Sequence, residues 1–138
     1  MEANRRNNLH SQPVRVLLVD DSSVLRRALR ILLENHDCQV CGEAASGREA
    51  LAKLTAVSPD VVVLDYQMPV MNGLEVATEM QKKAPNIPIL MVSTFLTPQL
   101  SETAQKVGVK GTCSKEDIDC LVLAVETVAT DGTYFRES

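Results

Sequence analysis

A run of four large apolar residues that ends in a carboxylate constrains the fold of this chain more than any other feature. Residues 61–64 are Val-Val-Val-Leu, Asp65 follows at once, and Pro69 comes soon after. A strand that is apolar on both sides is buried on both faces, which is typical of the middle of a parallel sheet. Asp65 is then expected where the strand leaves the sheet, at the carboxyl edge where open α/β sheets place their functional groups.

Apolar runs and helical periodicities alternate along the rest of the chain. The segments between the runs place apolar residues at the spacing of one helix face. Ser22 can cap the first of these helices and Asn72 the third. Ser46 and Glu49 have the spacing of a capping box. We therefore expect five strand–helix units, with strands over residues 14–19, 40–44, 61–64, 87–92 and 109–113.

The composition of each strand predicts its place in the sheet. The first, third and fourth strands are almost wholly apolar, so we place them in the interior. The second and fifth contain glycine and polar residues, so we place them at the edges. The strand order 2-1-3-4-5 satisfies both conditions. The predicted fold is α/β, a doubly wound five-stranded parallel sheet with five helices.

Length and charge exclude several classes of protein. A chain of 138 residues is long enough for one domain with a full core. Its net charge of −4 argues against a nucleic-acid surface, and no apolar run approaches the ~20 residues of a membrane helix. We expect a cytoplasmic domain over residues 14–132. Residues 1–13 lack the apolar stretch of a signal peptide and are expected to be a flexible tail, and 133–138 a tail or the start of a linker.

Four cysteines raise the question of metal or redox chemistry. Cys38 and Cys41 have C-x-x-C spacing, but no second pair has it. They lie in and before a short strand, whereas a thiolate is stabilised at a helix N-terminus. We therefore expect all four cysteines to be reduced and structural, including Cys113 and Cys120.

Polar groups follow the ends of four of the expected strands. In the order 2-1-3-4-5, Asp20 and Asp21 meet Asp65 where the strand order reverses, and Ser93 and Lys115 flank them. Carboxylates this close repel one another, so one is protonated unless a cation joins them. Carboxylates, a carbonyl and retained waters suit Mg²⁺. An ionised Asp65 can then attack phosphorus. Lys115 neutralises charge on the oxygens of the transferring phosphoryl group, and the Ser93 hydroxyl can donate a hydrogen bond to one of them.

Each of these residues has a simpler explanation when taken alone. Paired aspartates after a strand are more often helix caps, and a single lysine is usually solvated. Five such groups at the ends of four strands of one sheet are far harder to attribute to chance. Their coincidence favours a site.

The residues and their spacing resemble the receiver domain of two-component response regulators over about residues 14–132. The resemblance rests on Asp20-Asp21, Asp65-Tyr66-Gln67-Met68-Pro69 with Gly73, Val92-Ser93, and Gly111 ahead of Lys115. It implies a flavodoxin-like receiver fold in which Asp65 is the phosphoacceptor. It implies a Mg²⁺ site formed by Asp20, Asp21, Asp65 and the backbone carbonyl of Gln67. It also implies that Ser93 is the switch hydroxyl, that Lys115 binds phosphate, and that the donor is a phosphohistidine on a sensor histidine kinase.

Two further features bear on the subfamily and on the switch. Glu116 and Asp117 after Lys115, together with the ending Gly132-Thr133-Tyr134, resemble the NarL/FixJ subfamily, whose receivers precede a LuxR-type DNA-binding half. This chain lacks such a half, so we expect no direct contact with nucleic acid. Thr112 stands where the family usually has an aromatic residue. We therefore expect coupling through the fourth helix and its preceding loop, because that helix has the least apolar area to anchor it.

Three functional classes compete for these features. A phosphorylation-dependent switch, most readily one in transcriptional regulation, is favoured, with no enzyme activity beyond its own phosphorylation and dephosphorylation. A pseudo-receiver that binds partners without phosphorylation is the alternative. A phosphatase of the haloacid-dehalogenase type needs a second aspartate two residues after the nucleophile, where this chain has Gln67. The face formed by the fourth helix, fifth strand and fifth helix can support a homodimer, and no membrane partner is expected.

Overall fold

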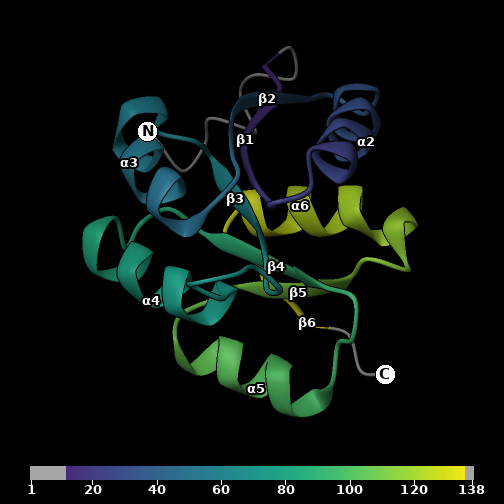
Figure 1. Cartoon of the computed structure of the whole chain (residues 1–138). Coiled ribbons are helices and arrows are strands. Elements are labelled where there is room, and N and C mark those ends of the chain that lie inside the picture. The colour runs from purple at the N-terminus through teal and green to yellow at the C-terminus, as the bar shows by residue number, and fades with distance from the viewer. Residues whose placement is uncertain (1–11, 136–138) are drawn as a thin grey trace.

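A sheet of six parallel strands forms the middle layer of the computed structural model, which describes residues 12–135 (Figure 1). Two helices cover one face of this sheet and three cover the other. The first face carries α2 (Ser23–Glu34) and α6 (Leu121–Ala129). The second carries α3 (Gly47–Val57), α4 (Gly73–Lys83) and α5 (Pro98–Lys106). The strands are β1 (Val14–Val19), β2 (Cys38–Ala44), β3 (Val61–Asp65), β4 (Ile89–Ser93), β5 (Gly111–Ser114) and β6 (Tyr134–Phe135).

The strand order is β2-β1-β3-β4-β5-β6, which confirms the predicted arrangement of the first five strands and adds a sixth. In the added strand, Tyr134 pairs with Gly111 and Phe135 pairs with Thr112. Two residues carry no alternating pattern, so the sequence did not predict this strand. The prediction of a five-stranded sheet with β5 at its edge is corrected accordingly.

Successive residues of each strand pack against opposite layers of helices. In β1, Val16 and Leu18 pack on the side of α2 and α6, whereas Leu17 and Val19 pack on the side of α3, α4 and α5. Every residue of β3 and β4 is buried. Burial of apolar surface contributes about 25 cal/mol per Å². These central strands are therefore the best-anchored part of the sheet, and they carry the ends from which the polar groups project.

Polar side chains cap the starts of α2, α3, α4 and α5. Asn72 and Glu75 form a complete capping box at the start of α4. The box predicted at the start of α3 is only half formed. Ser46 Oγ accepts from the backbone N–H of Glu49, but the Glu49 carboxylate accepts from the N–H of Ala45 instead of returning to Ser46.

The helix α5 is anchored less firmly than its neighbours, as its composition predicted. Ala104 is its single buried residue, whereas each of the other four α-helices buries at least two. The expected fifth helix begins with a 3₁₀ turn, η2 (Ile118–Cys120), and continues as α6. None of the helices in the described residues combines the length and the apolar character needed to cross a membrane.

Candidate functional site

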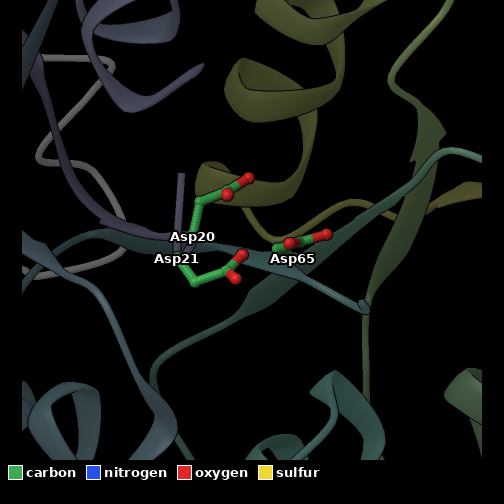
Figure 2. Close-up of side chains that lie close together, drawn as sticks. All are labelled: Asp20, Asp21 and Asp65. Carbon is green, nitrogen blue, oxygen red and sulfur yellow. The ribbon is translucent and has the colours of Figure 1, made fainter. Parts of the chain in front are cut away.

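Three carboxylates converge at the carboxyl edge of the sheet. Asp20 and Asp21 follow β1, and Asp65 is the last residue of β3. Figure 2 shows their side chains close together, and one oxygen of each lies within 4.8 Å of the other two. Asp65 and Asp20 are buried, with 2% and 4% of their surface exposed, whereas Asp21 is exposed. The cluster is therefore closed to solvent at Asp65 and open at Asp21.

The register of the parallel strands brings the predicted residues to this edge. Asp20 follows the β1 residue whose partner on β3 immediately precedes Asp65. Ser93 follows the β4 residue that pairs with Asp65. Lys115 follows the last residue of β5, which pairs with Ser93. The register of the sheet therefore places polar residues side by side at the carboxyl ends of β1, β3, β4 and β5.

Lys115 bridges the two buried carboxylates. Its Nζ lies 2.9 Å from Asp65 Oδ1 and 3.5 Å from Asp20 Oδ2. Its backbone N–H donates to the carbonyl of Ser93 at 2.9 Å, which fixes the base of the side chain. One ammonium neutralises only one of three carboxylates. The cluster therefore keeps an excess of negative charge.

Two buried polar atoms of the site have no hydrogen-bond partner among the described residues. They are Asp65 Oδ2 and Ser93 Oγ, at the ends of the neighbouring strands β3 and β4. Buried polar atoms in proteins are nearly always paired, because an unpaired one costs about 1–3 kcal/mol. A ligand that presents a cation or a hydrogen-bond donor to Asp65 Oδ2 and an acceptor to Ser93 Oγ would therefore be stabilised here.

The pKa values of the buried pair reflect the same excess of negative charge. Burial raises the pKa of Asp65 above its usual value, the hydrogen bond from Lys115 opposes the rise, and the charge of Asp20 adds to it. Burial lowers the pKa of Lys115, but its hydrogen bond to Asp65 and the charges of both carboxylates outweigh this, so the pKa is raised. A cation at the cluster would favour the ionised form of Asp65.

The donors of the cluster fit a hard divalent cation. Carboxylate oxygens are the ligands that Mg²⁺ prefers, and Asp20, Asp21 and Asp65 each bring one within 4.8 Å of the others. Asp20 Oδ1 accepts from the N–H of Ser22 at 2.8 Å, so that carboxylate is already oriented. The backbone N–H of Gln67 donates to Asp65 Oδ1 at 3.2 Å, which places the Gln67 backbone beside the cluster.

Gly73 allows the loop after β3 to fold back over Asp65. A Cβ atom on this residue would lie 2.7 Å from the carbonyl oxygen of Asp65 and 2.8 Å from Cα of Tyr66. The N–H of Gly73 donates to the carbonyl of Tyr66 at 2.9 Å, which closes the turn. Because both obstructing atoms belong to the backbone, any side chain at this position would push the loop away from the end of the strand.

Two contacts around the site were not predicted from the sequence. Gln67 Oε1 accepts from the backbone N–H of Thr94 at 3.1 Å and so joins the loops that follow β3 and β4. Arg26, on α2, donates to the carbonyl of Asp20 at 2.5 Å. Gln67 belongs to the motif at residues 65–69, but its place there does not indicate a side-chain contact with the loop after β4, and Arg26 belongs to no motif. Both contacts depend on how segments distant in the sequence meet in the fold.

Comparisons with known sequences agree on one family. A profile of the response regulator receiver domain matches residues 16–126. The chemotaxis protein CheY of Thermotoga maritima is 38% identical over 96 residues, which cover 70% of this chain and 80% of that protein. The protein-glutamate methylesterase/protein-glutamine glutaminase of Geobacillus kaustophilus is 44% identical over 91 residues, 65% of this chain. The matched part is 26% of that enzyme, so this chain corresponds to about a quarter of its length.

Solved structures give the same family. The LuxR-family two-component response regulator of Aurantimonas sp. SI85-9A1 has a TM-score of 0.86 at 27% identity, covering 89% of both chains. The signal receiver domain of the response regulator NarL of Mycobacterium tuberculosis has a TM-score of 0.81 at 31% identity, covering 87% of this chain and 98% of that one. The profile match extends over most of the chain and includes the carboxyl ends of β1, β3, β4 and β5, which carry the site. The chain therefore belongs to the response regulator receiver domains of two-component signalling.

Proposed function

We propose that this chain is a phosphorylation-dependent switch in which Asp65 accepts a phosphoryl group from the phosphohistidine of a sensor histidine kinase. The observation that carries the proposal is the buried Oδ2 of Asp65, which has no hydrogen-bond partner among residues 12–135. The other oxygen of the same carboxylate is held by Lys115 at 2.9 Å. A carboxylate oriented on one oxygen and unpaired on the other is suited to nucleophilic attack.

The residues of the site then have distinct roles. A carboxylate oxygen of Asp65 forms a bond to phosphorus while the bond from phosphorus to the imidazole nitrogen of the donor breaks, and the imidazole takes up a proton from solvent. Lys115 neutralises one phosphoryl oxygen, and the hydroxyl of Ser93 donates to another. Asp20, Asp21, Asp65 and the carbonyl of Gln67 would hold Mg²⁺, which when bound supplies positive charge at the transferring oxygens.

We further propose that the phosphorylated state is relayed through α5 and the loop before it. Thr112 is fully buried in the position that is usually aromatic, and its Oγ1 lies 3.0 Å from Oγ of Ser101 on α5. This polar contact joins β5 to the helix with the fewest buried residues. Movement of Ser93 toward a phosphoryl group would pull on the adjoining loop and shift this lightly anchored helix. Amide exchange over residues 96–107 should therefore change when beryllofluoride binds.

The output we propose is transcriptional regulation, in the cytoplasm, by a longer protein or a partner that reads the receiver. The support is the similarity to receivers of LuxR-family and NarL regulators. We propose that the receiver has no catalytic activity beyond its own phosphorylation and dephosphorylation. The face formed by α5, β5 and α6 is the surface we assign to a homodimer or to the partner.

Incubation with acetyl phosphate and Mg²⁺ tests the proposal directly. The intact mass of the wild-type chain should increase by one phosphoryl group, and that of Asp65→Asn should not change. Size-exclusion chromatography of both samples then reports whether phosphorylation changes the oligomeric state. A wild-type chain that gains no mass would instead be a pseudo-receiver, and a phosphorylated Asp65→Asn variant would place the acceptor elsewhere.

A further inference from the structure

Two cysteines that are seven positions apart and lie on different elements have their sulfur atoms in contact. Cys113 lies on β5 and Cys120 ends η2, and their Sγ atoms are 2.8 Å apart. The Sγ of Cys120 also donates to the carbonyl of Asp117 at 3.0 Å, and that of Cys113 lies 3.9 Å from the same oxygen. Both thiols therefore converge on one side of the turn between β5 and η2.

The pair with the C-x-x-C spacing is arranged differently. Cys38 and Cys41 lie on β2, three positions apart, and the register shift between β1 and β2 leaves Cys41 without a partner residue on β1, whereas Cys38 pairs with Val14. The Sγ of Cys38 donates to the carbonyl of His36 at 3.8 Å, and that of Cys41 to the carbonyl of Val16 at 3.4 Å. A strand holds these two thiols apart. The thiols of the C-x-x-C pair therefore have different partners, whereas Cys113 and Cys120, which form no motif, are in contact.

The joined pair borders an opening to solvent. A cleft of about 470 Å³ lies between the loop after β4 and the turn before α6, and its walls include both Cys113 and Cys120. Cys113 is buried, with 2% of its surface exposed, whereas Cys120 is only half-buried. A small oxidant that enters the cleft therefore reaches Cys120 first and finds Cys113 directly behind it.

We propose that Cys113 and Cys120 form an oxidisable dithiol, which hydrogen peroxide converts to an intramolecular disulfide. In the first step, the sulfur of Cys120 attacks one oxygen of hydrogen peroxide, the O–O bond breaks, and the leaving hydroxide takes up the thiol proton as water. In the second step, the sulfur of Cys113 attacks the sulfenic sulfur, the S–O bond breaks, and the leaving hydroxide takes up the Cys113 thiol proton as a second water. Two thiols lose two electrons in total, and the peroxide gains them.

The new bond would close the turn that carries Lys115. Lys115 lies between the two cysteines, which are seven positions apart. A cross-link over so short a segment removes most of the conformations that the turn can visit when it opens. Oxidation should therefore slow the opening of this turn, whatever happens at Asp65. Neither thiol takes part in the proposed phosphoryl transfer, so formation of the disulfide can be tested independently of phosphorylation at Asp65.

Peptide mapping of the full chain tests the dithiol. The protein is reduced, freed of reductant, treated with hydrogen peroxide and alkylated before digestion. We expect a peptide in which Cys113 and Cys120 are cross-linked, loss of alkylation at both, and recovery after dithiothreitol. Cys38 and Cys41 should remain alkylated in the same sample and serve as internal controls. A bond that joins Cys38 to Cys41, bonds between chains, or four alkylated cysteines would overturn the proposal.

Two variants and one exchange measurement sharpen the test. In Cys113→Ser, oxidation of Cys120 should stop at a sulfenic acid that dimedone labels, and in Cys120→Ser, Cys113 should stay alkylatable. Cys41→Ser is the matched control and should still give the cross-linked peptide. In the oxidised wild type, amide exchange over residues 114–119 should be slower by about tenfold or more. Unchanged exchange in a cross-linked sample would contradict the role assigned to the turn.

Discussion

Two clusters of charge lie close together in this molecule and are built from similar parts. In one, Asp65 and Asp20 share the ammonium of Lys115. In the other, Glu43 accepts from Arg26 at 2.9 Å and from Arg30 at 2.6 Å. The first cluster has more carboxylates than cations and leaves a buried oxygen unpaired. In the second, two cations bind Glu43 and pair both of its oxygens, and Arg30 also lies 3.5 Å from Glu34 Oε2.

The opposite balance of charge gives the two acids opposite pKa shifts. Burial raises the pKa of Asp65 despite its contact with Lys115. Burial acts in the same direction on Glu43, but the hydrogen bonds and charges of Arg26 and Arg30 outweigh it and lower the pKa. The carboxylate of Glu43 therefore stabilises the fold, whereas that of Asp65 destabilises it in the absence of a cation. Charge that destabilises a fold is retained where a ligand makes use of it.

Removal of divalent cations should have the largest effect, and it should act on one cluster alone. With acetyl phosphate and excess chelator, we expect phosphorylation of the wild-type chain to fall to background, because the carboxylate cluster would remain without its counter-charge. Added Mg²⁺ should restore it and raise the Tm by binding to the folded state. In Asp20→Asn with Asp21→Asn, the Tm should not respond to Mg²⁺. Glu43→Gln should respond as the wild type does.

Replacement of the bridging lysine should have the next largest effect. In Lys115→Gln, the initial rate of phosphorylation should fall by about 10²-fold, because an oriented cation no longer meets the transferring oxygens. Lys110→Gln is the matched control, since Lys110 is an exposed lysine near the other end of β5. The rates can be followed by intact mass. Equal rates in the two variants would remove Lys115 from the chemistry.

A variant that shifts Asp65 but keeps its carboxylate tests how far the site depends on the position of this residue. Gly73→Ala should lower the free energy of unfolding by about 2 kcal/mol, because its Cβ would meet the backbone of Asp65 and Tyr66 at under 3 Å. Phosphorylation should slow as well. Gly42→Ala is the control, because its Cβ would meet a flexible side-chain atom of Leu17 at 3.2 Å. Chemical denaturation measures both, and a larger loss in the control would contradict the assignment.

Neutralisation of each acid in turn should have the smallest effects, of opposite sign. At pH 7 without divalent cations, Asp65→Asn should raise the Tm by a few degrees, and Glu43→Gln should lower the free energy of unfolding by about 1 kcal/mol. The loss in Glu43→Gln should vanish as the pH falls through the lowered pKa of Glu43, below its usual 4.5.

The gain in Asp65→Asn follows from the opposite sign. It should grow as the pH rises above the usual value of 3.8, where the unfolded chain loses the proton that the folded chain keeps, and it should level off above the raised pKa of Asp65. Denaturation of the two variants and the wild type at a series of pH values measures these differences. Changes of the same sign in both variants would show that the two clusters are equivalent.

The main features of the fold were predictable because its interior strands are continuous or nearly continuous apolar runs in the sequence. Residues 61–64 and the apolar strands at 14–19 and 87–92 were predicted to be interior, and the common doubly wound order 2-1-3-4-5 satisfies that condition. The site followed, since parallel strands present their carboxyl ends at one edge and Asp20, Asp65 and Lys115 each lie there. The prediction that depends on the apolar character of whole strands and on their order in a parallel sheet was therefore confirmed.

The features that could not be predicted depend on contacts between elements or on very short segments. β6 has two residues, too few to show an alternation. The 3₁₀ turn η2 is a single turn, within which periods of 3.0 and 3.6 residues cannot be told apart. The contact between Cys113 and Cys120 joins a strand to that turn, and no rule of spacing connects them. The C-x-x-C spacing in the chain belongs to Cys38 and Cys41 and does not indicate this contact.

The short sixth strand limits how two copies of this domain can associate. β6 pairs with the first half of β5, Gly111 and Thr112, and the N–H of Tyr134 donates to the carbonyl of Lys110 at 3.0 Å. Within residues 12–135, continuation of the sheet from one molecule into another is therefore blocked along that half of β5, and β6 itself offers two residues for it. A homodimer on this side of the domain would then rely on side chains, so its strength can be adjusted by small shifts of α5 while the sheet itself stays intact.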